Sequence, residues 1–307
     1  MTDWQQEISA ASARINGHVL RTPTAVIAGP GLSRPIEVKF EQMQHTGSFK
    51  PRGAFNTLLT KTPGPAGLVA ASGGNHGAAV AYAARQLGHP ARIYVPEIAG
   101  PSKIALIRDL GADLQVVPGA YANAFEQALA WEAETGAEQV HAYDTVATVA
   151  GQGSLAMEWE DQGLSADTVL VAAGGGGLIA GVAAWLNGRR KVVSVEPKTC
   201  SALNSALKNG APIDVDISGV ASNALGAKRI GQICFDVAKE TAMQSVLVED
   251  KAITEAQKLL WKSHRQLVEP AGATALAALI SGAYTPERDE KIAVLVCGAN
   301  IAPDPFQ

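Results

Sequence analysis

The segment TVLVAAGGGGLIAG, residues 168–181, joins an uncharged apolar run to four consecutive glycines and a second apolar stretch. Residues 168–172 are rich in β-branched side chains and too apolar for one face to meet water, which is typical of a strand in a buried parallel sheet. Residues 178–185 have helical composition. A buried strand that turns through glycines into a helix predicts a βαβ unit, and therefore an α/β fold.

The same alternation of strand and helix continues on both sides of this segment. Further apolar runs with the composition of strands lie at residues 36–41, 67–72, 91–95, 114–117, 191–196 and 291–297. Helical composition marks residues 78–87, 103–110, 122–135 and 254–267, and helix-ending glycines follow three of them at Gly88, Gly111 and Gly136. This order predicts a doubly wound sheet. At 307 residues the chain can form two domains or one large one, and the Thr-Pro-Gly-Pro break at 62–65 is a candidate crossing between domains.

The composition excludes several classes of protein. Hydrophobic residues make up 47% of the chain and charged residues 18%, which suits a large buried core. The net charge is −4 and there is no basic run, so we expect no nucleic-acid partner. No leader pattern or membrane-length apolar window occurs, so we expect a cytoplasmic protein with no membrane partner. Cys200, Cys234 and Cys297 lack metal-binding spacing, which predicts reduced thiols.

The four glycines leave backbone amides unshielded where a helix begins, which is a ready site for an anion. One or two glycines would satisfy a tight turn, whereas four in a row lose much conformational entropy on folding, so phosphate binding is the better explanation. A nicotinamide dinucleotide is one candidate. Gly175, Gly177 and Ala180 fit the GxGxxA pattern, and Glu196 ends the next strand about where a ribose-binding acid would lie.

Three other loops have unusual chemistry that a dinucleotide would leave unused, whereas a cofactor with one phosphate and an aldehyde uses all four. The motifs TGSFKPRGA at 46–54, ASGGNHG at 71–77, GGGGLIAG at 174–181, VEPAGA at 268–273 and VCGAN at 296–300 occur in this order. Together they resemble the fold type II pyridoxal-phosphate enzymes of the serine/threonine dehydratase and serine racemase family, over about residues 21–300. The resemblance implies two open, doubly wound, mostly parallel sheets with flanking helices, like the tryptophan synthase β-subunit, and pyridoxal 5'-phosphate (PLP) as cofactor.

The resemblance also implies a role for residues in each motif. Lys50 would form the Schiff base with PLP and then act as the base at the substrate α-carbon, since an amine that can lose its proton can do both. Arg52 would help to order the helix that follows. The other implied contacts are Asn75 with the cofactor 3-hydroxyl, Gly174, Gly175, Gly176 and Gly177 with the phosphate, Cys297 with the pyridine nitrogen, Phe49 and Glu269 with the ring, and Ser72, Gly73, Asn75 and His76 with the substrate carboxylate.

Three of these residues also have structural interpretations that the sequence leaves open. His76 is a packing or capping histidine in the interpretation that we favour over acid–base catalysis. Cys297 is equally compatible with a buried structural cysteine. Glu269 precedes a proline and fits the N-terminal carboxylate of a helix.

Dehydratases and racemases of this family both remove the α-proton, and they differ in what faces the substrate opposite the lysine. The racemases carry a serine just before the Gly-Asn-His triplet, whereas this chain has Gly73, which has no proton to deliver. This departure favours β-elimination of L-threonine to 2-oxobutanoate, or of L-serine to pyruvate, with release of ammonia. Serine racemization, dehydration of 3-hydroxyaspartate, an NAD(P)-binding oxidoreductase and a non-catalytic small-molecule sensor remain as alternatives.

The resemblance sets further expectations for the whole chain. Residues 1–62 and 146–307 would form a large cofactor-binding domain and residues 63–145 a small mobile substrate domain, in a homodimer. Some members bind a divalent metal through an acidic cluster after the strand that here ends at Glu196. This chain lacks the second carboxylate, so we expect no metal unless Asp214 or Asp216 supplies a ligand. Because the chain stops soon after Asn300, we expect no C-terminal regulatory domain and no feedback by isoleucine.

Overall fold

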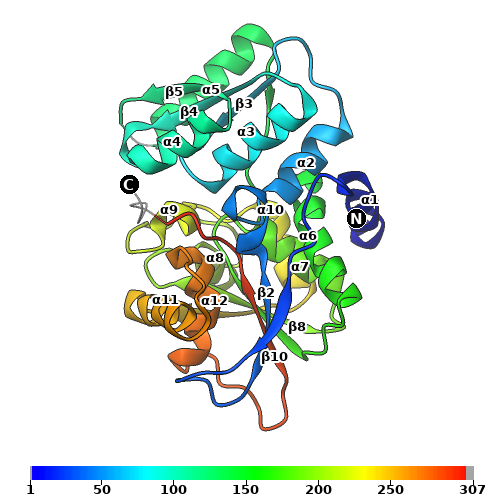
Figure 1. The fold of residues 1–307 in the computed structure, drawn as a ribbon, viewed down its shortest axis with the longest axis vertical. Coiled ribbons are helices and arrows are strands. Elements are labelled where there is room, and N and C mark those ends of the chain that lie inside the picture. The colour runs from blue at the N-terminus through cyan, green and yellow to red at the C-terminus, as the bar shows by residue number, and fades with distance from the viewer. Residues whose placement is uncertain (1, 120, 302–307) are drawn as a thin grey trace.

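Apolar strands gather into two separate sheets, which define a large lobe and a small lobe (Figure 1). The structure is a computed structural model and describes residues 2–119 and 121–301. The large lobe contains a six-stranded sheet in the order β1-β2-β10-β7-β8-β9, and the small lobe a four-stranded sheet in the order β5-β4-β3-β6. The pair β1 and β2 is antiparallel, and the other neighbours are parallel. The predicted fold class is confirmed.

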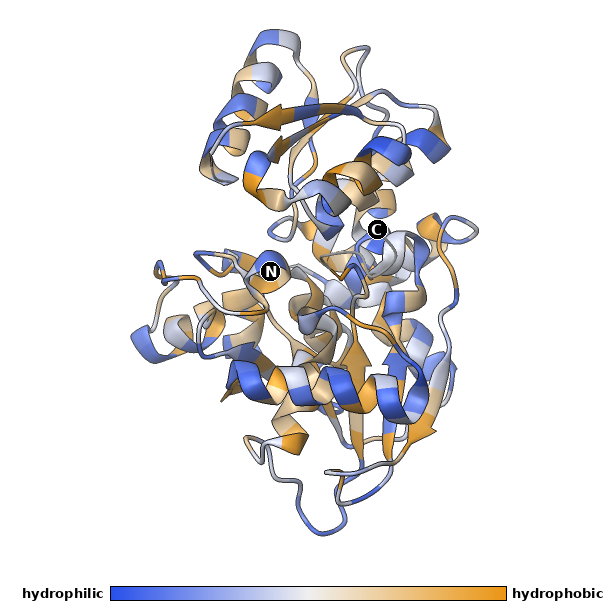
Figure 2. Ribbon diagram, turned by 60° about the vertical axis from the view of Figure 1, so that its left-hand side comes forward, coloured by the Kyte–Doolittle hydropathy of each residue, from blue (hydrophilic) through white to orange (hydrophobic). Residues whose placement is uncertain are grey.

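The large sheet is buried between two layers of helices. Its strands are β1 (Thr24–Ile27), β2 (Ile36–Phe40), β7 (Thr168–Ala172), β8 (Lys191–Pro197), β9 (Gln244–Val248) and β10 (Ile292–Val296). One layer is α12 (Pro270–Ile280) with α11 (Asp250–His264) packed on it, and the other contains α7 (Gly177–Leu186), α6 (Val146–Asp161) and α1 (Trp4–Ile15). Figure 2 shows hydrophobic residues along the central strands and polar residues on outer helices, as burial of a parallel sheet requires.

The small lobe uses the two-residue period of its strands to build two cores. It contains β3 (Leu68–Ala71), β4 (Ala91–Pro96), β5 (Asp113–Val117) and β6 (Glu138–Gln139), with α3 (Asn75–Leu87), α4 (Pro101–Asp109) and α5 (Tyr121–Thr135). Leu68 and Ala70 of β3 belong to the core beneath α3, and Val69 and Ala71 to the core beneath α5. These strands lie within residues 63–145, whose domain boundaries and mobility remain predictions.

Two tightly packed helices carry the chain between the lobes. Helix α2 (Pro51–Thr60) precedes the small lobe, and α6 follows it. A Cβ atom added to Gly53 would lie 2.4 Å from Gln152 Nε2, and one added to Gly151 would lie 2.6 Å from the Arg52 carbonyl oxygen. Asn56 Nδ2 also donates to the Ala147 carbonyl at 2.7 Å. Glycine is therefore needed on both helices for this close approach.

The predicted strands and helices are present, with several corrections at their ends and edges. The helix predicted over 254–267 runs from Asp250 to His264, because Arg265 takes a left-handed conformation with φ 56°. Strands β1, β6 and β9 were not predicted, nor were the helices α1, α6, α8 (Ala202–Asn209), α9 (Ser222–Leu225) and α10 (Gln232–Glu240). The helices expected after Lys50 and after Glu269, for which no ends were predicted, are α2 and α12. All three cysteines are buried and free of disulfides, as predicted. Across the described ranges, no helix has both the length and the apolar character that a membrane span requires.

Candidate active site

Three strands of the large sheet end beside one another and bring distant motifs together. The chain runs from β7 to β8 on one side, whereas β10 lies on the other side of β7, between it and β2. Such a switch in strand order leaves room for a ligand at the carboxyl ends of the strands. The loop after β2 is tied to the loop after β10, since Phe49 N donates to Cys297 O at 3.2 Å and Ala299 N donates to Gly47 O at 2.8 Å.

Lys50 lies in this loop, immediately before the first residue of α2. Its ammonium group donates to the Ala142 carbonyl at 2.8 Å. Burial lowers the pKa of Lys50 to about 8, although Cys297 and Glu269 act to raise it. The lysine is therefore a partly neutral amine near pH 8, which is the state that a nucleophile or base requires. Thr46, in the same loop, has a positive φ of 61°, a rare conformation for threonine that is typical of functional sites.

The four glycines after β7 lead into α7, whose start no side chain caps. Added Cβ atoms would lie 2.3 Å from the Tyr143 ring at Gly175, 2.5 Å from Cys234 Sγ at Gly176 and 2.9 Å from Leu225 Cα at Gly174. Only glycines therefore fit between the helix start and its neighbours. The uncapped amides and the positive end of the helix dipole suit a phosphate, so this loop fits the phosphate of PLP.

The second loop, residues 72–77, leads from β3 into α3. The Ser72 hydroxyl accepts a hydrogen bond from Gly74 N at 3.3 Å, and no side chain caps α3. His76 lies within 2.7 Å of the Val140 carbonyl through Nε2, which must then carry the proton. Burial and the charge of Lys50 lower the pKa of His76 to about 3. This geometry supports the packing interpretation of His76 over acid–base catalysis.

Asn75 connects the two lobes through its side chain. Its Nδ2 donates to Glu269 Oε1 at 2.6 Å, and its Oδ1 accepts from Asn300 Nδ2 at 2.8 Å. Burial raises the pKa of Glu269 to about 7, against lowering by Asn75 and by nearby lysines. The buried Cys297 thiol has a raised pKa for the same reason and donates to the Ala271 carbonyl at 3.5 Å. Cys297 is therefore neutral, as the partner of an unprotonated pyridine nitrogen would be.

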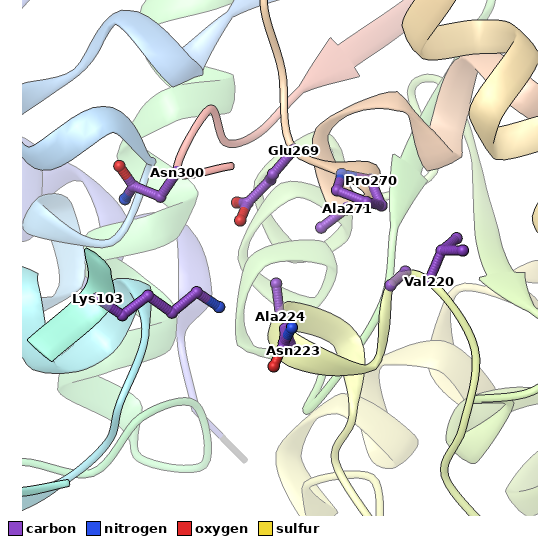
Figure 3. A pocket seen from close by; sticks show the side chains of 9 residues that line it. Lys103, Val220, Asn223, Ala224, Glu269, Pro270, Ala271 and Asn300 are labelled. Carbon is purple, nitrogen blue, oxygen red and sulfur yellow. The ribbon is translucent and has the colours of Figure 1, made fainter. Parts of the chain in front are cut away.

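A small pocket of about 40 Å³ opens between the lobes beside these groups (Figure 3). Its lining includes Lys103 of the small lobe, which is buried and points into the pocket. The other lining residues are Val220, Ala221, Asn223, Ala224, Glu269, Pro270, Ala271 and Asn300. Sequence reasoning missed Lys103, because a lysine in the first turn of a predicted helix is usually exposed and nothing in the sequence places it opposite Glu269.

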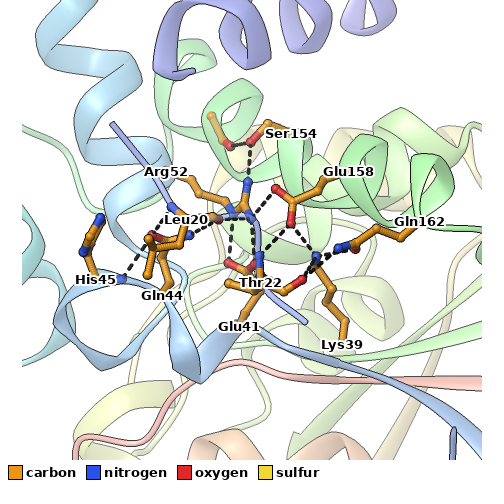
Figure 4. Close-up of polar contacts among 11 residues, drawn as sticks. Leu20, Thr22, Lys39, Glu41, Gln44, His45, Arg52, Ser154, Glu158 and Gln162 are labelled. Atoms are coloured by element: carbon orange, nitrogen blue, oxygen red, sulfur yellow. Dashed lines mark hydrogen bonds and ion pairs between the residues drawn. The ribbon is translucent and has the colours of Figure 1, made fainter. Parts of the chain in front are cut away.

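Phe49 and Arg52 flank Lys50 in the sequence and do not line this pocket. Phe49 packs against the core of the large lobe, and its ring centroid lies 5.2 Å from Lys50 Nζ. Arg52 is buried in a network of charged side chains (Figure 4). It donates to both carboxylate oxygens of Glu41, at 2.9 and 2.7 Å, and to Glu158 at 2.8 Å. This network fixes the first turn of α2, next to the lysine.

Glu196, which the dinucleotide interpretation needs, serves another purpose. Its two carboxylate oxygens accept from the backbone amides of Leu203 and Asn204, each at 2.8 Å. Glu196 therefore caps α8 from inside the protein and does not meet the expectation of a ribose ligand. Asp214 pairs with Arg229 at 2.6 Å, and within residues 2–119 and 121–301 no group of three acidic, histidine or cysteine side chains could hold a metal. The absence of a metal remains a prediction.

Comparison with known proteins places this geometry in one family. The pyridoxal-phosphate dependent enzyme family matches residues 15–298. Phenylserine dehydratase from Ralstonia pickettii is 33% identical over 95% of this chain and 92% of its own length. L-Threonine ammonia-lyase from Thermotoga maritima is 32% identical over 96% of this chain and 75% of its own.

Solved structures agree with this family. Maize serine racemase has a TM-score of 0.90 at 30% identity, covering 97% of this chain and 94% of that structure. The threonine deaminase of T.th. has a TM-score of 0.90 at 33% identity, covering 98% and 99%. Membership of one family therefore explains the lysine loop, the glycine loop and the thiol that fit PLP. This chain belongs to the pyridoxal-phosphate dependent enzymes, with their fold type II architecture, and PLP is its cofactor.

Proposed function

We propose that this chain is a PLP-dependent ammonia-lyase that dehydrates L-threonine or L-serine to 2-oxobutanoate or pyruvate. When bound, PLP holds the amino group of the substrate and withdraws electrons from its α-carbon. The observation that carries the choice of reaction is Gly73, where the racemases of this family have a serine. The relatives named above as a dehydratase and an ammonia-lyase support the same choice.

Lys50 supplies the base for this reaction. Its lowered pKa, about 8, leaves a large fraction of the amine neutral and able to take the α-proton. The Ala142 carbonyl and the charge network around Arg52 hold the lysine and the helix behind it. The substrate carboxylate finds donors at the uncapped start of α3, together with the Ser72 hydroxyl.

Packing around Gly73 explains why no hydroxyl is available there. A Cβ atom at residue 73 would lie 2.4 Å from Ala99 Cβ, which is closer than two such atoms approach. His76 is no substitute, because its ring is neutral and its Nε2 proton is directed to the Val140 carbonyl. The α-carbon can then be reprotonated from the lysine side alone, which favours loss of the β-hydroxyl over inversion.

The side chain of the substrate is the less constrained part of the proposal. Serine and threonine are the first candidates, because the L-threonine ammonia-lyase named above matches 96% of this chain. Phenylserine is a second candidate, because the dehydratase named for it matches 95% of this chain. A panel of L-serine, L-threonine, L-threo-phenylserine, 3-hydroxyaspartate and D-serine, assayed for ammonia and oxo acid, ranks these substrates. Formation of D-serine without oxo acid would overturn the dehydratase assignment.

A lysine variant tests the assignment of the base. Lys50→Ala is expected to lose the visible absorption that borohydride abolishes in the wild type, and nearly all turnover. Its thermal melt without cofactor should be unchanged, because Lys50 contributes chemistry rather than core packing. Lys50→Arg should not restore activity, since arginine stays charged. Wild-type turnover in Lys50→Ala would remove Lys50 from the mechanism.

The assembly and location of the protein are separate proposals. A homodimer in the cytoplasm is expected from the resemblance to the family. Sedimentation at several protein concentrations measures the oligomeric state. A monomer with full activity would contradict the first proposal, and fractionation of the source cells tests the second.

A further inference from the structure

Two buried charges face the same pocket from different lobes. Lys103, on α4 of the small lobe, is 7% exposed, and Glu269, at the start of α12 in the large lobe, is 3% exposed. Both line the pocket in Figure 3, where the Lys103 side chain extends toward its centre. Burial of a charge without a partner is unfavourable, so a pair of opposite charges in one pocket calls for a common explanation.

Neither charge is neutralised by a direct ion pair. Lys103 makes no hydrogen bond, and no ion pair within 4.0 Å, with any residue that the structure describes. Glu269 Oε1 accepts from Asn75, whose amide is neutral. The cations that act on Glu269 are Lys103 first and Lys50 second. Lys103 is thus the main source of positive charge for a carboxylate that lies across the lobe boundary.

We propose, on the basis of the function proposed above, that Lys103 is a positioning residue that acts through Glu269. Its ammonium group balances the negative charge of Glu269 from the opposite lobe, and the ionised carboxylate in turn holds Asn75. An ionised carboxylate accepts a stronger hydrogen bond from an amide than a neutral acid does. Because Asn75 is the first residue of α3, this contact also sets the position of the loop that precedes it.

Four groups face Glu269, and the test must separate the effect of Lys103 from the effects of the other three. They are Asn75 and Lys103 from the small lobe, and Lys50 and Cys297 from the large lobe. Cys297 is neutral and Lys50 is engaged by the Ala142 carbonyl, so Lys103 is the group whose charge can be removed without changing the proposed base. Loss of a nearby cation disfavours the ionised carboxylate and raises its pKa.

Carbon-13 NMR of glutamate side chains measures this directly, without turnover. The PLP-loaded enzyme and the cofactor-free protein would be labelled at the glutamate carboxyl carbon, with Glu269→Gln identifying the signal. Lys103→Met should raise the midpoint of the Glu269 titration by about one pH unit. Lys103→Arg keeps the charge and should leave the midpoint in place. Arg108→Met is the matched control, because Arg108 is an exposed cation on the same helix.

Kinetics then connect the charge to the reaction. In Lys103→Met the acid limb of the kcat/KM profile should shift to higher pH by the same amount as the NMR midpoint. The value of kcat/KM should recover at higher pH, and it should also recover in Lys103→Arg. An unmoved midpoint in Lys103→Met would overturn the proposal. An unmoved midpoint with a rise in KM for 3-hydroxyaspartate alone would instead make Lys103 a receptor for a second substrate carboxylate. If the enzyme dehydrates no substrate, the proposed function fails while the NMR titration still decides the role of Lys103.

Discussion

Gly73 is a residue at which packing and reaction outcome are linked. Because an added Cβ would lie 2.4 Å from Ala99 Cβ, Gly73→Ser alone should lower the melting temperature or the affinity for PLP. Gly73→Ser combined with Ala99→Gly removes this contact and leaves Val95 Cγ1, at 3.1 Å from the added Cβ, as the nearest neighbour, so the double variant should tolerate the hydroxyl better than the single one. The double variant is expected to form more D-serine per pyruvate from L-serine in deuterated buffer than the wild type does. The measurement is the ratio of the two products.

The controls separate sterics from chemistry. Ala99→Gly alone should keep the product ratio of the wild type. A double variant that folds, binds PLP and still makes no additional D-serine would show that a hydroxyl at residue 73 does not reach the α-carbon. The φ angle at Gly73 is not in the left-handed region, so a side chain at this position adds no backbone strain that could itself destabilise the variants.

Single residues differ in how far sequence could predict their position. The structure brings Lys50, Asn75, Glu269 and Cys297 together as expected, because each belongs to a motif with distinctive neighbours. Tyr143 carries no such signal, although its ring packs against the glycine loop. The packing of such residues depends on contacts between segments far apart in the chain, which composition and spacing do not encode. Their roles in catalysis remain predictions.

The glycine loop makes a prediction at the level of the element. A methyl group at residue 175 would lie 2.3 Å from the Tyr143 ring, so Gly175→Ala must displace either the ring or the start of α7. We expect PLP affinity to fall at least about tenfold, since a phosphate site depends on the positions of several backbone amides. Gly64→Ala, in a loop with open space around it, is the control and should bind PLP normally. Cofactor titration by absorption gives both constants, and equal constants would place the phosphate elsewhere.

The charge network under α2 makes a second prediction at this level. Arg52→Met leaves the fully buried Glu41 without its main partner, which should lower the free energy of unfolding by about 3–5 kcal/mol. Arg229→Met is the control, because Arg229 and Asp214 are 58% and 68% exposed and such pairs contribute about 1 kcal/mol or less. Urea unfolding of the two variants compares them. A similar small loss in both would show that Glu41 is neutralised in another way.

The elements that sequence did not predict share physical causes. Fully buried strands such as β7 are continuous apolar runs, and their prediction is accurate to about a residue. Edge strands β1 and β9 are partly exposed and mix polar with apolar residues. Helix α6 is buried on most sides, so it lacks the 3.6-residue period that reveals a surface helix.

At the scale of the whole molecule, His76 should make folding stability depend on pH. Its pKa is lowered from 6.5 to about 3 by burial, so between these values the unfolded chain binds a proton that the folded protein does not. The contribution of His76 is therefore present above pH 6.5 and is lost as the pH falls toward 3. The buried Glu196 and Glu269, with pKa values raised to about 7, act in the opposite sense over their own range. A single variant is needed to isolate the histidine.

We expect the melting temperature of the wild type to rise relative to that of His76→Gln as the pH increases from 4 to 7. Glutamine keeps a donor for the Val140 carbonyl but does not titrate. Melts of the cofactor-free protein, across this range and at constant ionic strength, give the difference at each pH. A difference that does not change with pH would mean that His76 is solvated or charged in the folded state.

The arrangement of the lobes was the least predictable property of the whole molecule. Sequence located a break at 62–65 and the strands on each side of it, but the way in which the lobes meet depends on contacts such as that between Gly53 and Gly151. Nothing in the spacing of two glycines about 100 residues apart identifies them as neighbours. The resemblance to a family predicted two domains, but it did not describe this helix pair.

The contact between α2 and α6 predicts which movement of the small lobe would leave both chain crossings intact. Both crossings of the chain pass through one helix pair, which is locked by glycine packing and by the bond from Asn56 to Ala147. Sliding of one helix along the other would break these contacts, whereas a rotation in the segments beyond them would leave them intact and would break the bonds of Asn75 with Glu269 and Asn300. We therefore predict that the small lobe rotates about this helix pair as a pivot. Lys50 immediately precedes α2 and would move little in such a rotation, whereas Asn75 and Lys103 would move with the small lobe relative to Glu269.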